Sequence, residues 1–85
     1  MRELVTPRQL IRGFITENFL VEDFSDETSF RASGLVDSMG IAQLVTFLEV
    51  AFGVRIEDAD LTPENLDSVA SAAALVERKR GRTAA

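Results

Sequence analysis

The sequence contains no cysteine and no histidine, and these two absences exclude several kinds of chemistry. Without cysteine there can be no disulfide framework and no thiolate metal site. Without histidine the chain lacks the commonest general base and the commonest metal ligand. Paired carboxylates remain possible, but they need a cleft, and a chain of 85 residues has little concave interior. We therefore expect a protein that is not an enzyme by itself.

Long apolar segments are also missing. No run approaches the roughly 18 residues of a membrane span, and residues 1–20 lack the charged start and apolar centre of a signal peptide. We expect a cytoplasmic protein without membrane insertion. With 46% hydrophobic and 27% charged residues, the chain suits one soluble, monomeric domain, 1–85, with frayed ends at 1–5 and 80–85.

Basic residues are scarce in the middle of the chain. Residues 21–76 carry eleven acidic residues against Arg31 and Arg55, a net charge of −9, whereas residues 77–85 carry +3. Such an acidic body repels the phosphates of nucleic acids and favours partners with basic faces. The basic tail suits the C-terminal end of a helix, whose dipole favours cations. We therefore expect no binding to nucleic acids.

Apolar residues at helical spacing predict three longer helices. The first covers residues 7–20, where Thr6 and Gln9 form a capping box and a proline occupies the first turn. The last begins after a cap at Asp67 or Ser68. Its inward stripe, in which small alanines permit close helix approach, consists of Val69, Ala72, Ala73 and Val76.

The second longer helix, residues 38–52, has two faces of different character. It begins at Asp37 or Ser38 and stops at Gly53. Its core face consists of Ile41, Leu44, Val45, Leu48 and Phe52. The opposite face consists of Met39, Gln43, Thr46 and Val50, with Phe47 and Glu49 on its flanks. Because this outward face is nearly uncharged, we expect it to be a contact surface for partner proteins.

Two connections complete an all-α bundle of three longer helices and one short helix. Residues 21–37 show no sustained period and are expected to form a long loop, held to the bundle by apolar anchors. These anchors are Phe24, Phe30, Leu35 and Val36. Residues 54–56 are expected to be a buried loop segment rather than a strand. Residues 62–66 begin with threonine and proline and predict the short helix, anchored by Leu61 and Leu66.

The stretch GLVDSMG, residues 34–40, exposes a serine, Ser38, at the start of the second longer helix. An Asp-Ser pair can simply cap a helix, but a cap does not require the long preceding loop or the flexible Gly34. A serine in the first turn lies beside unpaired N–H groups and the positive end of the helix dipole, which suits a phosphate ester. Since the chain offers no histidine to activate this serine, another protein would have to modify it.

GLVDSMG, followed by IAQLVTFLEVAFGVRI and LTPENLDSVASAAALVERK, resembles the acyl carrier proteins and the related peptidyl and aminoacyl carriers. The resemblance covers about residues 14–79 and combines a G-x-x-D-S-[LM] signature with the apolar pattern of two helices. It implies an acyl-carrier-like four-helix bundle in which Ser38 receives 4'-phosphopantetheine from coenzyme A. A separate phosphopantetheinyl transferase with Mg²⁺ would run that reaction, and the cofactor thiol would hold an acyl or aminoacyl group as a thioester.

The resemblance also implies roles for the neighbours of Ser38. Asp37 would help the transferase to grip the site, and Met39 would pack at the base of the arm, where partner enzymes dock. Gly34 would let the loop turn, and Leu35 would anchor it. The implied partners are an acyl- or aminoacyl-loading ligase or adenylating enzyme, followed by a synthase, transferase or thioesterase.

The chain departs from fatty-acid-type carriers along its second longer helix. Gln43 and Val50 stand where acids are common in such carriers, which leaves Glu49 nearly alone. Docking should then depend more on apolar contact than on charge. The sequence GLVDSMG is similar to the corresponding stretch of D-alanyl carriers and discrete natural-product carriers. We therefore expect a discrete carrier for one natural-product, polyketide or lipid pathway. The alternative is a helical interaction module without a prosthetic group.

Overall fold

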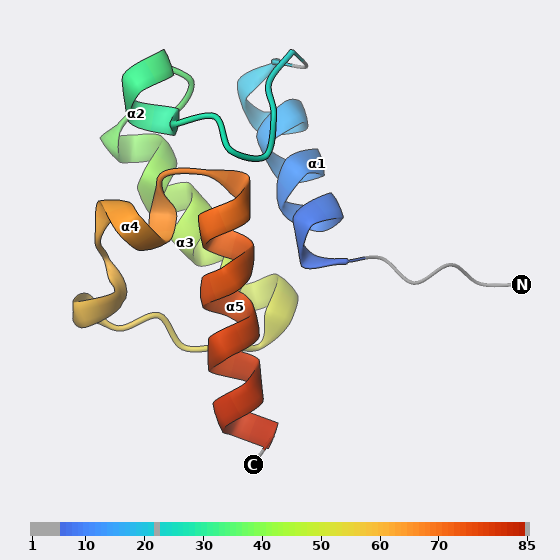
Figure 1. The fold of residues 1–85 in the computed structure, drawn as a ribbon, viewed down its shortest axis with the longest axis vertical. Helices are drawn as coiled ribbons and strands as arrows, with labels where there is room; N and C mark the ends of the chain where they lie inside the picture. Colours follow the sequence, from blue (N-terminus) through green and yellow to red (C-terminus); the bar gives the residue numbers. More distant parts are fainter. Residues whose placement is uncertain (1–5, 22, 85) are drawn as a thin grey trace, which may run out of the picture.

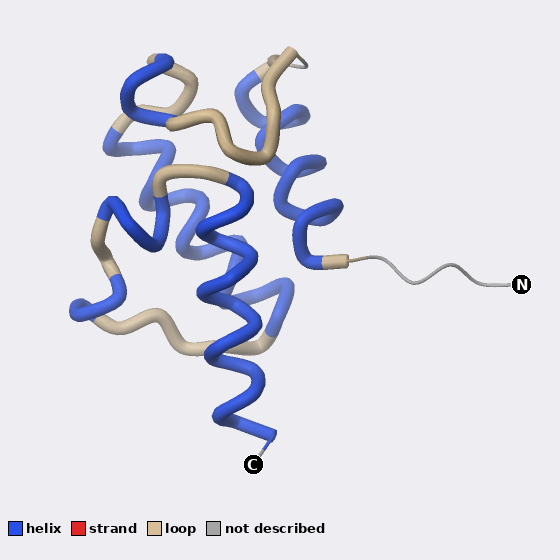
Figure 2. The backbone as a smooth tube through the Cα atoms, viewed as in Figure 1, coloured by secondary structure: helices blue, strands red, loops and turns tan. Residues whose placement is uncertain are grey.

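The structure is a computed structural model that describes residues 6–21 and 23–84. Within these residues every regular element is helical and none is a strand (Figure 2). The long helices are α1 (Pro7–Phe19), α3 (Ser38–Phe52) and α5 (Val69–Ala84). The connections hold two single turns, α2 (Phe30–Ser33) and α4 (Pro63–Leu66), and a 3₁₀ turn, η1 (Asp58–Asp60) (Figure 1). The expected all-α bundle with three longer helices is confirmed.

The ends of α1 follow the signals in the sequence. Thr6 Oγ1 accepts a hydrogen bond from the Gln9 backbone N–H at 3.2 Å, and Gln9 Oε1 accepts one from the Thr6 N–H at 2.9 Å, which is the expected capping box. Ile11 and Ile15 are completely buried. The helix ends one residue earlier than expected, because Leu20 takes a left-handed conformation with φ 56°.

The connection between α1 and α3 differs from the plain loop that we expected, because it contains α2. A single turn shows no repeat in the sequence and is not stable alone, so the periodicity could not reveal it. In the structure Ser29 Oγ caps this turn by accepting from the Ala32 N–H at 3.0 Å. Its first residue, Phe30, is completely buried. Phe24 and Val36 are buried as expected, and Leu35 is half-buried against the core.

The part of this connection before α2 is tied to two long helices. The Arg12 guanidinium donates to Asp26 Oδ1 at 2.9 Å and to the Phe24 carbonyl, and it lies 4.3 Å from the centroid of the Phe24 ring. The Asp26 carbonyl accepts from the Ala70 N–H at 2.8 Å. These contacts hold the connection against both α1 and α5. In Figure 1 the connection passes above the start of α5 on its way to α2.

The second half of the chain contradicts one expectation and decides between two alternatives for the cap of α5. Leu61 was expected to be an anchor beside Leu66, but only Leu66 is buried, whereas Leu61 is 48% exposed. The cap of α5 is Ser68, whose Oγ accepts from the Ser71 N–H at 3.0 Å. Asp67, the other candidate cap, turns instead toward α2. The segment around the buried Val54 forms no strand, as expected.

The core contains buried side chains of α1, α3, α4 and α5, and α5 packs most closely against α1 and α4. Every member of the expected inward stripe of α5 is buried, and Leu75, which the stripe left out, is buried with it. None of the described helices is both long and apolar enough to cross a bilayer. The expected fraying of residues 1–5 falls outside the described residues. The helical backbone of α5 continues to Ala84, and fraying at 80–85 stays a prediction.

Candidate functional site

Ser38 is the first residue of α3, and its side chain is exposed. Asp37 caps the helix, because one of its carboxylate oxygens, Oδ1, accepts from the Gly40 N–H at 2.9 Å and its carbonyl accepts from the Ile41 N–H at 2.9 Å. Within the described residues the N–H groups of Ser38 and Met39 have no such acceptor. The positive end of the α3 dipole therefore meets solvent beside the Ser38 hydroxyl.

The first turn of α3 lies directly against the end of α1, and Gly40 makes this approach possible. A Cβ atom at Gly40 would lie 2.6 Å from Val36 Cγ1 and 2.8 Å from Phe19 Cε1, closer than carbon atoms can stand. The sequence analysis gave Gly40 no role. Its signal was a glycine inside a helix, where glycine costs about 1 kcal/mol relative to alanine unless something requires it.

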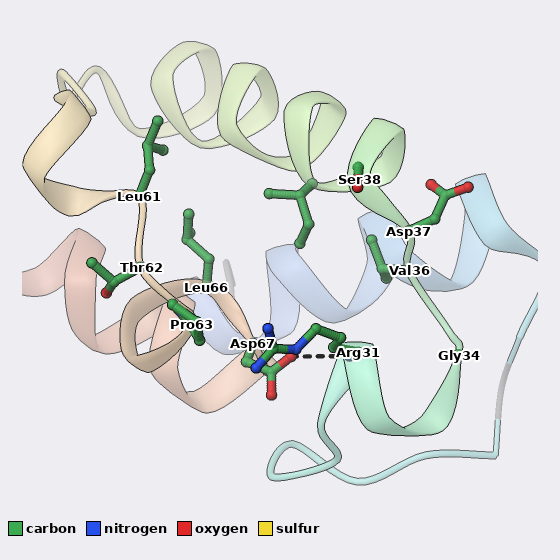
Figure 3. A pocket seen from close by; sticks show the side chains of 11 residues that line it. Arg31, Gly34, Val36, Asp37, Ser38, Leu61, Thr62, Pro63, Leu66 and Asp67 are labelled. Atoms are coloured by element: carbon green, nitrogen blue, oxygen red, sulfur yellow. Dashed lines mark hydrogen bonds between the residues drawn. The ribbon is translucent and has the colours of Figure 1, made fainter.

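A groove of about 420 Å³ opens beside Ser38 (Figure 3). The α3 side contributes Val36, Asp37, Ser38 and Ile41, the α2 side contributes Arg31 and Gly34, and the α4 side contributes Leu61, Thr62, Pro63, Leu66 and Asp67. Gly34 ends α2 with φ 77°, which lets the chain turn back toward α3 as expected. The groove thus has a largely apolar lining, with charged groups near its edges.

Asp67 joins the α2 side of the groove to the α4 side. Its Oδ2 accepts from the Ser29 hydroxyl, its Oδ1 accepts from the Arg31 N–H at 3.0 Å, and its carbonyl accepts from the Phe30 N–H at 2.7 Å. The hydrogen bond from Ser29 is the main reason that the pKa of Asp67 lies below its ordinary value of 3.8. Partial burial opposes this shift, while the Arg31 and Phe30 N–H groups and the Arg31 charge add to it.

The four residues that the sequence analysis placed on the outward face of α3 are all exposed, and Phe47 lies on its flank. Met39 is 73% exposed, Val50 is 79% exposed, and Gln43 and Thr46 are also exposed. Phe47 is half-buried, because its ring stacks on Phe14 with 4.4 Å between centroids. Phe47 can therefore offer only part of its surface to a partner.

Glu49, the one acidic residue of α3, serves the fold. Its Oε2 accepts from the Ile56 N–H at 2.9 Å, and the side chain is half-buried. This hydrogen bond fixes the connection that follows α3. The outward face of α3 consequently presents no carboxylate of its own.

The sequence analysis missed Arg31, Ser29, Thr62 and Asp67 as neighbours of the site. Asp67 and Ser29 are 38 residues apart, so no local pattern could bring them together. For the described residues, no group of three or more acidic side chains is placed to hold a metal ion.

A family model described as "Phosphopantetheine attachment site" matches residues 8–76, which is most of the chain. No curated protein matches the sequence significantly.

Proposed function

Because the chain belongs to the family of phosphopantetheine attachment domains, we propose that Ser38 is the residue to which its arm is attached. Domains of this family carry a covalent 4'-phosphopantetheine group and are carriers rather than enzymes. The observation that carries the proposal is the exposed hydroxyl of Ser38, at the start of a long helix and on the edge of a groove.

The residues around Ser38 fit such a group. A phosphate ester on Ser38 would lie beside the N–H groups of Ser38 and Met39, where the helix dipole favours negative charge. The apolar side chains of Val36, Ile41 and Leu66 offer contact to the rest of the arm. The arm supplies a terminal thiol, which holds cargo as a thioester, in a chain that has no cysteine.

Attachment requires a second protein, because no histidine or cysteine is present to activate the hydroxyl. The Ser38 oxygen forms a bond to the phosphorus atom that carries the pantetheine part of coenzyme A. The phosphoanhydride bond breaks at the same time, and adenosine 3',5'-bisphosphate leaves. The serine proton passes to a base of the phosphopantetheinyl transferase. Asp37, whose Oδ1 caps α3, supports this step by holding Ser38 at the helix start and offers its other oxygen to the transferase.

Carrier domains of this family work with a phosphopantetheinyl transferase and with partner enzymes. We propose that the partners meet the outward face of α3, formed by Met39, Gln43, Thr46, Val50 and the exposed part of Phe47. Since Glu49 is engaged with Ile56, this face binds mainly through apolar contact. Raising the ionic strength should therefore change the affinity of a partner much less than for a carrier with an acidic α3.

The pathway that fits this face is a dedicated one. We propose that a ligase or adenylating enzyme loads an acyl or aminoacyl group, and that a synthase, transferase or thioesterase removes it, in a natural-product, polyketide or lipid pathway. The support is the uncharged outward face, which suits a small set of matched partners better than broad recruitment by charge.

Intact-mass measurement tests the attachment. The protein is incubated with coenzyme A, Mg²⁺ and a transferase of broad specificity, and it should gain the mass of one phosphopantetheine group. Ser38→Ala should abolish the gain, whereas Ser33→Ala, at another exposed serine, should leave it intact. A folded wild-type protein that gains no mass would refute the carrier function and favour a plain interaction module.

A further inference from the structure

The α2 side of the groove is formed by a helix that is not stable by itself. α2 has four residues, and a single turn gains too few hydrogen bonds to offset the entropy of ordering it. Two tertiary contacts hold it in place: the buried ring of Phe30 and the hydrogen bonds of Asp67. Phe30 fixes the turn to the core, whereas Asp67 fixes it to the α4 side of the groove.

Asp67 supplies the negative charge at the N-terminal end of α2 that an acidic residue within α2 would otherwise supply. The first turn of α2 contains no acid, and its N–H groups would be unpaired without a partner. The Asp67 carbonyl and carboxylate accept the N–H groups of Phe30 and Arg31, and the carboxylate also accepts from the hydroxyl of Ser29, which caps Ala32. Asp67, the residue that follows α4, thus completes the N-terminal end of α2.

These hydrogen bonds connect two sides of the same groove. Arg31 and Gly34 line it on the α2 side, while Leu66, next to Asp67, is a buried part of its lining on the α4 side. In Figure 3, α3 with Ser38 runs along one side of the groove, and Asp67 lies with Arg31 on the other side. We define the hydrogen bonds of Asp67 with Ser29, Phe30 and Arg31 as the α2 clasp.

We propose that Asp67 is a positioning residue for the prosthetic arm: through the α2 clasp it keeps the groove beside Ser38 in the shape that receives the arm. This inference rests on the proposed attachment of the arm to Ser38. Without the clasp, α2 stays attached through Phe30 but loses its fixed position, so the groove loses one side while α1, α3 and α5 remain packed. The lowered pKa of Asp67 agrees with a carboxylate that its partners hold in the charged form.

Three variants separate the clasp from general stability. Asp67→Asn keeps the size of the side chain but replaces one of its two accepting oxygens by an NH2 group, which only donates. Ser29→Ala removes the hydroxyl that donates to Asp67. Asp58→Asn, at an exposed acid of η1, is the control with the same change of charge.

The first measurement uses the protein without its arm. The backbone amide chemical shifts of α2 should move away from helical values in Asp67→Asn and Ser29→Ala, while those of Leu48 in α3 and Val76 in α5 stay close to wild type. Asp58→Asn should leave all of them in place. If α2 keeps its shifts in both clasp variants, the proposal is wrong, whether or not Ser38 can be modified.

The second measurement compares the loaded with the unloaded protein. In the wild type, loading should move the methyl resonances of Leu61 and Leu66, which line the groove, more than those of Val50 on the outward face. This difference should fall at least twofold in Asp67→Asn and persist in Asp58→Asn.

These measurements distinguish failure of the proposed attachment at Ser38 from failure of the proposed role of Asp67. If intact mass shows no loading of Ser38 in any variant, the proposed attachment fails, and the α2 shifts still test the clasp. If loading succeeds but moves no groove methyl in the wild type, or moves them equally in Asp67→Asn, Asp67 does not position the arm. Should Asp67→Asn unfold, Ser29→Ala decides the question.

Discussion

Replacing Gly40 by alanine tests whether α3 is seated against α1 by close contact at its first turn. Gly40 is buried, two residues after Ser38. A Cβ atom there would lie 2.6 Å from Val36 Cγ1 and 2.8 and 2.9 Å from two ring carbons of Phe19. Carbon atoms in favourable contact stand about 3.5 to 4.0 Å apart. Either these side chains move, or the turn that carries Ser38 moves.

Two opposing effects decide the change in the free energy of unfolding. Alanine is a better helix former than glycine by about 1 kcal/mol, whereas an extra carbon in a filled site costs about 1 to 3 kcal/mol. Val36 is β-branched and stiff, and two side chains must yield together, so we expect the clash to dominate. The net loss of stability should be about 1 kcal/mol.

Gly13 offers a matched control for the same substitution. It lies within α1, and a Cβ atom there would meet nothing within 4 Å. Gly13→Ala should therefore stabilise the protein by about 0.5 to 1 kcal/mol. Urea unfolding followed by circular dichroism measures both variants, and Phe19→Leu in the Gly40→Ala background should recover part of the loss.

A second readout concerns Ser38 itself. Because a displaced first turn would present its hydroxyl less accurately, the transferase should modify Gly40→Ala more slowly, and Gly13→Ala at the wild-type rate. If Gly40→Ala proved as stable as Gly13→Ala, and Ser38 were modified at the same rate in both, close contact at Gly40 would not seat α3.

Three further predictions concern stability. Leu20→Gly should stabilise the protein by about 1 kcal/mol in urea unfolding, because Leu20 is 87% exposed and holds a left-handed conformation that disfavours side chains; no gain would contradict a strained Leu20. Leu48→Ala should cost about 2 to 5 kcal/mol, because Leu48 is completely buried, and a cost like that of a surface change would contradict its place in the core. The pKa of Asp67 is lowered in the folded state, so the unfolded chain binds the proton more readily. The stability that Asp67 contributes is therefore complete above its ordinary pKa of 3.8. This contribution is lost as the pH falls through the pKa of the folded state. Unfolding at pH 7 and near pH 3 should therefore show a smaller acid loss in Asp67→Asn than in the wild type, and an equal loss would contradict the shift.

The sequence analysis was most successful where a signal and its effect lie within a few residues. The capping box of Thr6 and Gln9, the left-handed stop at Gly53 and the start of α3 at Ser38 are all formed by close neighbours along the chain. The apolar spacing of α5 identified its buried stripe for the same reason, because residues three and four apart share one face of a helix.

The predictions that failed concern residues whose partners are distant. Its position beside the predicted short helix indicates that Leu61 is an apolar anchor. In the structure its side chain is about half exposed and lines the groove. The sequence predicts a loop where α2 forms, because a single turn leaves no period in the sequence. Neither outcome depends on the residue alone, since each is set by what packs against it.

The sequence by itself determined that this chain forms a small helical carrier domain with Ser38 at the start of a helix. Caps and apolar periods act over one or two turns, so they can be recognised from neighbouring residues in the sequence. Tertiary structure alone decided the site around Ser38: the close approach of Phe19 to Gly40, and the hold of Asp67 on α2 across 36 to 38 residues. Such contacts form only when the folded core brings distant segments together, so no local pattern of residues encodes them.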